Sequence, residues 1–198
     1  MLSHCGSSLH SCMHCSRLAV VVPCFEDFAC VQPLVDELEQ VQQQISDKNS
    51  MIKVLVVNDS PWIIPDKKPL LPDNIYLSCL QLPFNVGHQT AIACGIKWLI
   101  KHDPNFEYLV SMDIDGEDDP HKIPLLISRL IGKQENEKQA ANYRRIAVAK
   151  RGLRREGKKF IASYELYKFL TILLTGKQLD FGNFIAFSRT AAEIIAAT

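Results

Sequence analysis

The chain has 198 residues, of which 47% are hydrophobic and 22% charged, and its 22 basic and 22 acidic residues give a formal net charge of zero. This composition is typical of one globular domain, and the length excludes two large ones. No run approaches the roughly 20 apolar residues that span a bilayer, so we expect no membrane-spanning helix within the sequence given.

Residues 1–16 are small and polar, and they contain three histidines and three cysteines. Such a density of ligands can hold zinc, but the spacing fits no compact four-ligand pattern. We therefore expect a disordered tail, followed by one domain over residues 17–198. The whole chain has seven cysteines, an odd number, and no secretory signal, which favours a reducing compartment over a disulfide framework.

From Leu18 onward the sequence alternates between strand and helix patterns. Apolar runs predict strands over residues 18–23, 52–59, 75–82, 107–115 and from residue 145. Helical spacing of apolar residues predicts helices over residues 28–45, 88–102, 121–131 and 160–176. Residues 179–198 read as a turn, a short apolar segment and a helix of small residues. This alternation predicts an α/β fold with a mostly parallel sheet and helices on both faces.

Five acidic side chains are crowded directly after the strand pattern of residues 107–115: Asp113, Asp115, Glu117, Asp118 and Asp119. Like charges this close repel one another, so a cation among them would stabilise the fold. Carboxylates suit Mg²⁺ or Mn²⁺, which commonly bind one or two of them together with the phosphates of a nucleotide. The pattern thus predicts a metal shared with a diphosphate, and the alternative is a loop of solvated acids.

Other polar residues follow the remaining strand patterns. Residues 25–27 come after the first strand, and Asn58 and Asp59 close the second. Ligands of open parallel sheets bind beyond the carboxyl ends of the strands, so we expect these residues to share the edge that carries the acidic cluster. His88 and Gln89 begin a predicted helix after Gly87. His88 can bond donor phosphate or sugar hydroxyls, or it can merely cap the helix.

Basic residues gather after the fifth strand, where residues 144–159 hold eight Lys and Arg against one Glu. Arg binds phosphate through a rigid fork and Lys as a point charge. This segment can hold a leaving diphosphate, an anionic acceptor or lipid head groups, or it can be a solvated loop. The aromatic helix at 160–176 suits a membrane surface, and a buried core helix explains it nearly as well.

The motifs, taken together, resemble a known family. In order they are VVVPCFED, VLVVNDS, FNVGHQTAIACGI, SMDIDGEDDP, RGLRREGKKF and LDFGNF. This set resembles the family 2 glycosyltransferases of the GT-A fold, which is a Rossmann-like architecture. It is most similar to the polyprenyl-phosphate branch, which includes dolichol-phosphate mannosyltransferases and undecaprenyl-phosphate glucosyltransferases, and the likeness covers residues 18–189.

The resemblance implies a pocket for a nucleotide-sugar donor. Asp59 would contact the base or ribose, and Asp113 the ribose or the metal. Phe25 stands where the family usually has Tyr, and Asp27 where it has Glu, which keeps the chemistry. The implied donor-binding residues are Pro23, Phe25, Asp27, Asp59, Asn85, Gly87, His88, Gln89 and Asp113.

The resemblance also implies the metal ligands and the catalytic residues. Mg²⁺ or Mn²⁺ would be held by Asp113, Asp115 and Glu117, the last standing where the branch often has Gln. Arg151 and Arg154 would face the phosphates. Together with Asp115 and with Asp180 of the DxGDF-like motif, they form the expected catalytic set.

Departures from the family pattern bear on the acceptor. Asn183 replaces the second Asp of the DxGDF motif, and Ile185 stands where Arg is common. A sugar hydroxyl needs a carboxylate base, which Asn183 does not supply, whereas a phosphate acceptor is already ionised. We therefore expect inverting transfer to a polyprenyl phosphate. The branch usually continues into transmembrane helices, which this sequence lacks.

Alternative functions remain open from the sequence. One is a relative with a hydroxyl acceptor, using Asp118, Asp119 or Asp180 as base, and another is a silent domain that only binds a nucleotide sugar. The expected location is cytoplasmic, at the inner face of the membrane. The sequence leaves open a homo-oligomer, and its short basic run beside an acidic site argues against a nucleic-acid partner.

Overall fold

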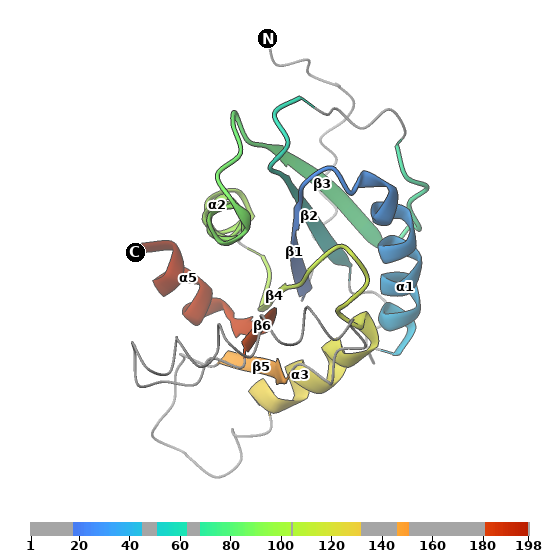
Figure 1. The fold of residues 1–198 in the computed structure, drawn as a ribbon. Helices are drawn as coiled ribbons and strands as arrows, with labels where there is room; N and C mark the ends of the chain where they lie inside the picture. The colour runs from blue at the N-terminus through green and yellow to red at the C-terminus, as the bar shows by residue number, and fades with distance from the viewer. Residues whose placement is uncertain are drawn as a thin grey trace, which may run out of the picture.

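The computed structural model describes residues 18–44, 51–62, 68–103, 105–131, 146–150 and 181–197. Its strands are β1 (Leu18–Cys24), β2 (Ile52–Asn58), β3 (Ile75–Gln81), β4 (Tyr108–Ser111), β5 (Ile146–Lys150) and β6 (Phe181–Ser188). Its helices are α1 (Val31–Gln44), α2 (His88–His102), α3 (Ile123–Ile131) and α5 (Arg189–Ala197), with 3-10 turns η1 (Phe28–Cys30) and η2 (Pro120–Lys122) (Figure 1).

The strands form one six-stranded sheet in the order β3-β2-β1-β4-β6-β5. β1 lies at the centre of the parallel part, where it pairs with β2 and β4. β6 runs antiparallel to both β4 and β5, so the other five strands share one direction. The fold is therefore α/β with a mostly parallel sheet, as the alternating patterns predict, and it is consistent with a Rossmann-like arrangement.

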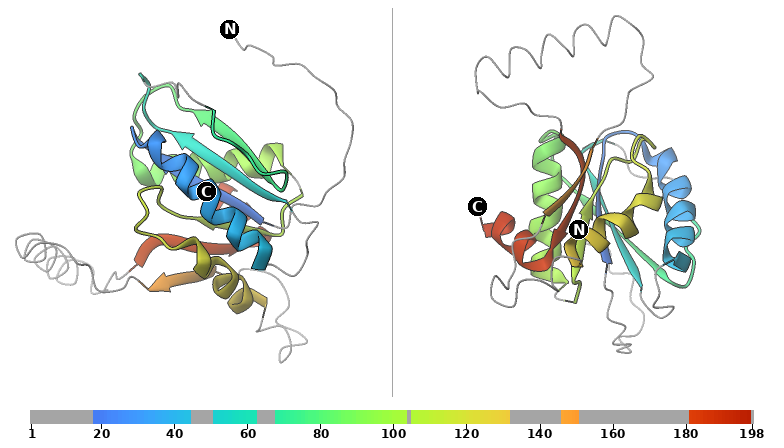
Figure 2. Two further views of the ribbon diagram at one scale, coloured as in Figure 1. Left: turned by 90° about the vertical axis from the view of Figure 1, so that its right-hand side faces the viewer. Right: turned by 90° about the horizontal axis from the view of Figure 1, so that it is seen from below.

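Helices cover both faces of this sheet (Figure 2). α1 and α3 pack on one face, over alternate residues of β1 and β2 such as Val20 and Val54. α2 and α5 pack on the other face, over the intervening residues such as Val21 and Leu55. Because β1 and β2 are buried from both sides, they read as continuous β-branched runs instead of alternating patterns.

Gly95 allows α2 to lie close to the sheet. A Cβ atom at this position would be 2.7 Å from the Val21 Cγ1 and 2.7 Å from the Val57 Cγ2. Such distances are too short for carbon atoms, so a side chain here would push the helix outward. The close approach fixes the amino end of α2, which begins at His88, relative to the strand ends.

The sequence predicts most elements but misplaces some boundaries. The strand expected over residues 107–115 ends at Ser111, so the acidic residues lie in a loop. The apolar segment within 179–198 is the eight-residue strand β6, which includes Asn183. The first helix breaks into η1 and α1. The helix expected at 160–176 and the tail at 1–16 lie outside the described residues.

Among the residues that the structure describes, no helix is both long enough and apolar enough to cross a bilayer.

Candidate functional site

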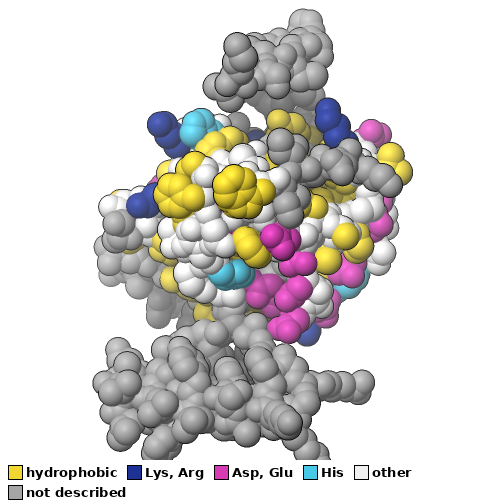
Figure 3. Space-filling view, turned by 45° about the horizontal axis from the view of Figure 1, so that its top comes forward, with side chains coloured by type: hydrophobic (Ala, Val, Ile, Leu, Met, Phe, Trp, Pro, Cys, Tyr) yellow, Lys and Arg dark blue, Asp and Glu magenta, His cyan; other side chains and the backbone are white. Residues whose placement is uncertain are grey.

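The sheet order brings the chemically active residues to one edge. β2 and β4 flank β1, and all three run in the same direction. Their carboxyl ends therefore place Phe25, Asp59 and Asp113 on neighbouring loops. This edge is turned toward the viewer in Figure 3, where acidic side chains gather in one group beside a histidine. Ligand sites of open parallel sheets lie at such an edge.

A pocket of about 220 Å³ opens on the α2 side of this edge. It is formed by the end of β1, the residues after β2 and the turn that leads into α2. Six of the nine residues expected to bind a donor line it, and Cys24 is an addition that the sequence analysis missed. The lining residues are Pro23, Cys24, Phe25, Asp59, Asn85, Gly87 and His88.

Asp59 lines this pocket and holds the turn before α2 in place. Its side chain is buried, and its Oδ1 accepts a hydrogen bond from the Val86 N–H at 2.7 Å. Its Oδ2 accepts from the Gly87 N–H at 2.9 Å, which the Asn85 Oδ1 also approaches at 2.9 Å. Gly87 adopts a φ of +83°, a conformation that favours glycine. Asp59 thus holds the turn before α2, in addition to any contact with a ligand.

A second set of hydrogen bonds fixes the loop after β1. The Glu26 N–H donates to the Ser60 Oγ at 2.8 Å, and the Ser60 N–H donates to the Asn58 Oδ1 at 2.8 Å. Glu26 has a φ of +66°, which is strained for a residue with a side chain. No local pattern in the sequence marks Ser60, because hydrogen bonds between distant loops leave no local signal.

Several carboxylates of the acidic loop accept hydrogen bonds from nearby backbone N–H groups. The Asp118 Oδ2 accepts from the Asp113 N–H at 2.8 Å, and the Asp115 Oδ1 accepts from the Glu117 N–H at 2.9 Å. Asp119 accepts from the His121 N–H at 3.0 Å, where it caps η2. Gly116 provides the turn with a φ of +82°. Several of these carboxylates therefore stabilise the loop, a role that the sequence analysis did not separate from metal binding.

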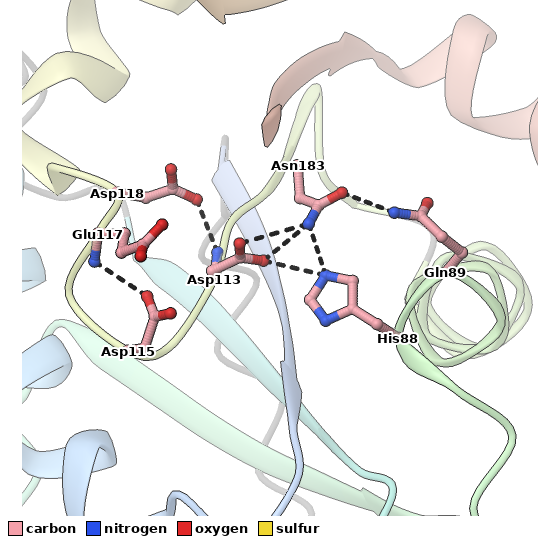
Figure 4. A network of polar contacts seen from close by, with 7 residues as sticks. All are labelled: His88, Gln89, Asp113, Asp115, Glu117, Asp118 and Asn183. Atoms are coloured by element: carbon pink, nitrogen blue, oxygen red, sulfur yellow. Dashed lines mark hydrogen bonds and ion pairs between the residues drawn. The ribbon is translucent and has the colours of Figure 1, made fainter. Parts of the chain in front are cut away.

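Asn183 connects this loop to α2 (Figure 4). Its Nδ2 lies 3.2 and 3.3 Å from the two carboxylate oxygens of Asp113 and 2.8 Å from the His88 Nε2. Its Oδ1 accepts from the Gln89 Nε2 at 2.7 Å. We call His88, Gln89, Asp113 and Asn183 the polar bridge. It joins residues from β6, from the start of α2 and from the loop after β4.

The electrostatic character of His88 follows from this bridge. Its Nε2 lies 3.0 Å from the Asp113 Oδ1, and this hydrogen bond raises the pKa of the imidazole above 6.5. Partial burial opposes the shift, whereas the charges of Asp113, Asp115 and Asp118 add to it. In the described part of the chain, no side chain caps the start of α2 by a hydrogen bond. The His88 side chain instead lies in the pocket wall, bonded to Asp113.

The carboxylates expected to bind a metal do not form a closed protein cage. Within the described ranges, no group of three or more His, Cys, Asp or Glu side chains is arranged to hold a metal ion. Asp113 points toward His88 and Asn183, whereas Asp115 and Glu117 lie on the opposite side of the Asp113 backbone in Figure 4. A smaller cavity of about 90 Å³ beside α1 is lined by Asp113, Asp115 and Asp118. This donor set suits a hard cation that takes its remaining ligands from phosphate oxygens.

Three of the expected catalytic residues, Arg151, Arg154 and Asp180, lie outside the described residues. Asp27 is exposed in the turn before η1, where its carbonyl accepts from the Cys30 N–H at 3.0 Å, and it does not line the pocket. Gln89 is also outside the lining and contacts Asn183 instead. The structure therefore gathers most of the expected donor residues, and it assigns Gln89 to the bridge.

A scan against protein-family models and a search of the curated proteins found no match to this chain.

Proposed function

We propose that this chain is a metal-dependent inverting glycosyltransferase of the GT-A type, which transfers a sugar from a nucleotide-sugar donor to a polyprenyl phosphate at the cytoplasmic face of a membrane. The observation that carries the proposal is the pocket beside the acidic loop. Six residues of the family-like donor motifs line it, although they come from three separate stretches of sequence. The polar bridge then ties the pocket to Asp113.

The proposal gives roles to several residues of the pocket and the acidic loop. The nucleoside lies in the pocket against the exposed ring of Phe25, and Asp113 accepts a hydrogen bond from a ribose hydroxyl. The imidazole of His88, whose pKa is raised by Asp113, faces the same pocket and can donate to donor phosphate through its second nitrogen. Asp115, which lines the cavity beside α1, would supply carboxylate oxygens for Mg²⁺ or Mn²⁺ together with Glu117 of the same loop. The metal, when bound, neutralises the charge that develops on the departing diphosphate.

The chemistry available at the bridge supports the choice of acceptor. In an inverting displacement, an acceptor oxygen forms a bond to the anomeric carbon as the bond to the diphosphate breaks, and the electron pair leaves with the diphosphate. A hydroxyl acceptor would need a base. Asn183 is an amide, Asp113 is already bonded to His88 and Asn183, and Asp118 and Asp119 accept from backbone N–H groups, whereas Asp180 lies outside the described residues. A phosphate oxygen needs no base, which favours the polyprenyl phosphate.

Turnover of a panel of nucleotide sugars tests the proposal, with Mg²⁺ or Mn²⁺ and with or without a short polyprenyl phosphate. The decisive variant is Asp115→Asn, which keeps an acceptor for the Glu117 N–H and removes only the charge. We expect product that requires the lipid phosphate and falls at least about a hundredfold in the variant. The matched control is Asp73→Asn, because Asp73 is exposed and precedes β3 at the opposite edge of the sheet.

Other outcomes separate the alternatives. Product with a sugar acceptor and a bell-shaped pH profile would replace the lipid phosphate by a hydroxyl acceptor. Metal-dependent donor binding without turnover, in the presence of membrane and acceptor, would indicate a silent binding domain. If no nucleotide sugar binds, the proposed function is wrong.

A further inference from the structure

A larger cavity lies on the other face of the sheet from the donor pocket. Its volume is about 720 Å³, within the range typical of small-molecule sites. The floor consists of Val56 on β2 with Leu77 and Cys79 on β3. Val56 and Leu77 belong to the apolar core under α1, whereas Asp59 and the turn before α2 serve the donor pocket on the opposite face.

Hydrogen bonds join the two walls of this cavity. One wall is the start of α1 with η1, including Phe28 and Val31, and the other is the segment with Pro69 and Leu71. Gln32 clamps this segment to α1, because its Oε1 accepts from the Leu70 N–H at 2.8 Å and its Nε2 donates to the Leu70 carbonyl at 3.3 Å. The same Nε2 donates to the Asp36 Oδ1 at 2.7 Å. These hydrogen bonds thus position the segment with Pro69 and Leu71 relative to α1.

The described residues that line this cavity are mostly apolar, with a single charge among them. Gln32 has both ends of its amide engaged in the clamp. Among the described residues that line the cavity, Lys68 is the only charged one, and no acid lines it. Apolar walls favour a hydrocarbon chain, and one exposed ammonium at the rim favours an anionic group at the end of that chain.

We propose that this cavity binds a single-chain anionic amphiphile of the fatty-acid type, with its chain over Val56 and Leu77 and its anionic group beside Lys68. The site lies on the α1 face, so its ligand and the nucleotide-sugar donor do not compete for space. The proposal is independent of the proposed function, because binding alone tests it.

The test is calorimetric titration of the whole chain with decanoate and with decanol, both below their aggregation limits. We expect decanoate to bind the unmodified chain with a 1:1 stoichiometry. The Cys79→Trp variant should bind decanoate at least about tenfold more weakly, because the indole would occupy the space above the floor of the cavity. The matched control is Tyr76→Trp, which lies on the same strand but faces the other side of the sheet. Lys68→Glu should weaken decanoate and leave decanol unchanged, and Lys101→Glu on α2 should change neither.

The unmodified chain provides a readout that does not depend on a variant. Decanoate should slow the alkylation of Cys79 by a maleimide, as located by peptide mapping, without slowing that of Cys94 on α2. Absence of decanoate binding, or equal binding by Cys79→Trp and Tyr76→Trp, would overturn the proposal. Binding to phosphatidylglycerol vesicles without binding of monomeric decanoate would also overturn it, since the face would then contact a membrane instead of enclosing one chain.

Discussion

Asn183 bonds to side chains from two other segments, and its amide chemistry decides what the site can do. Its Nδ2 faces the Asp113 carboxylate, and its Oδ1 accepts from Gln89. A carboxylate in its place would put two negative groups within about 3.3 Å of each other, which raises the pKa of one of them. The neutral amide instead keeps Asp113 oriented toward His88.

Asn183→Ala should weaken donor binding with little effect on stability. The substitution removes hydrogen bonds to the charged Asp113 and to Gln89, and we expect roughly tenfold weaker affinity for the nucleotide sugar. The bridge is partly exposed, so the free energy of unfolding should change by less than about 1 kcal/mol. Calorimetric titration and urea unfolding measure the two effects. Asn105→Ala, in a remote exposed loop, is the control, and equal affinity in both variants would contradict the bridge's role.

Cys24 should resist alkylation in the folded protein. Burial raises the pKa of its thiol from 9.0 to about 12, so the reactive thiolate is scarce at neutral pH. Because the folded pKa is above the unfolded one, the unfolded state loses its proton first. The contribution of Cys24 to stability is therefore present below pH 9 and is lost as the pH rises toward 12.

Peptide mapping after iodoacetamide treatment checks this prediction. We expect Cys24 to be modified only after unfolding in urea, whereas the partly exposed Cys94 reacts in the native state. Modification of both at the same rate in the folded chain would show that the end of β1 opens readily.

At the scale of elements, the residue pattern predicted whether a segment is a helix or a strand better than it predicted where the segment begins and ends. α2 spans His88–His102, as its helical spacing predicts. β4 is shorter than predicted, because Asp113 and Asp118 form a turn through the Asp113 N–H and so end the strand. β6 reaches back to Phe181, because it finds partners in β4 and β5. The ends of β4 and β6 depend on hydrogen-bond partners from other segments, which a local sequence pattern does not reveal.

Gly95→Ala should destabilise the packing of α2. Alanine has the higher helix propensity, by about 1 kcal/mol. The new methyl group would nevertheless meet Val21 and Val57 at 2.7 Å, and overpacking of this kind typically costs roughly 1 to 3 kcal/mol. We therefore expect a lower urea midpoint. Thr90→Ala, on the exposed side of the same helix, should leave the midpoint unchanged or raise it slightly, and a rise in both variants would contradict the close approach.

At the scale of the whole molecule, the sheet order decides where function is possible. Loops from β1, β2 and β4 meet at the carboxyl edge because these strands are parallel neighbours. Two hollows lie at this edge: one of about 220 Å³ is lined by His88, and one of about 90 Å³ is lined by Asp113. The pocket and the carboxylates are thereby positioned by neighbouring strands of one sheet.

Removal of divalent metal should abolish donor binding without lowering the stability of the free protein. The described residues offer no three-ligand group, and backbone N–H donors already bond to Asp115 and Asp118. We expect EDTA to leave the urea midpoint unchanged, and Mn²⁺ to bind at least about tenfold more tightly once the nucleotide sugar is present. Paramagnetic resonance of Mn²⁺ measures this coupling. Tight Mn²⁺ binding without nucleotide would contradict it.

The sequence by itself determined the fold class, the order of most elements and the residues at the strand ends. These features follow from local periodicity and from the rule that parallel strands converge at one edge. The tertiary structure decided what those residues contact. Asn183 meets Asp113 across 70 positions of sequence because β6 lies antiparallel beside β4, and Asp59 is committed to the turn before α2. Such contacts depend on the through-space pairing of strands, which no periodicity encodes.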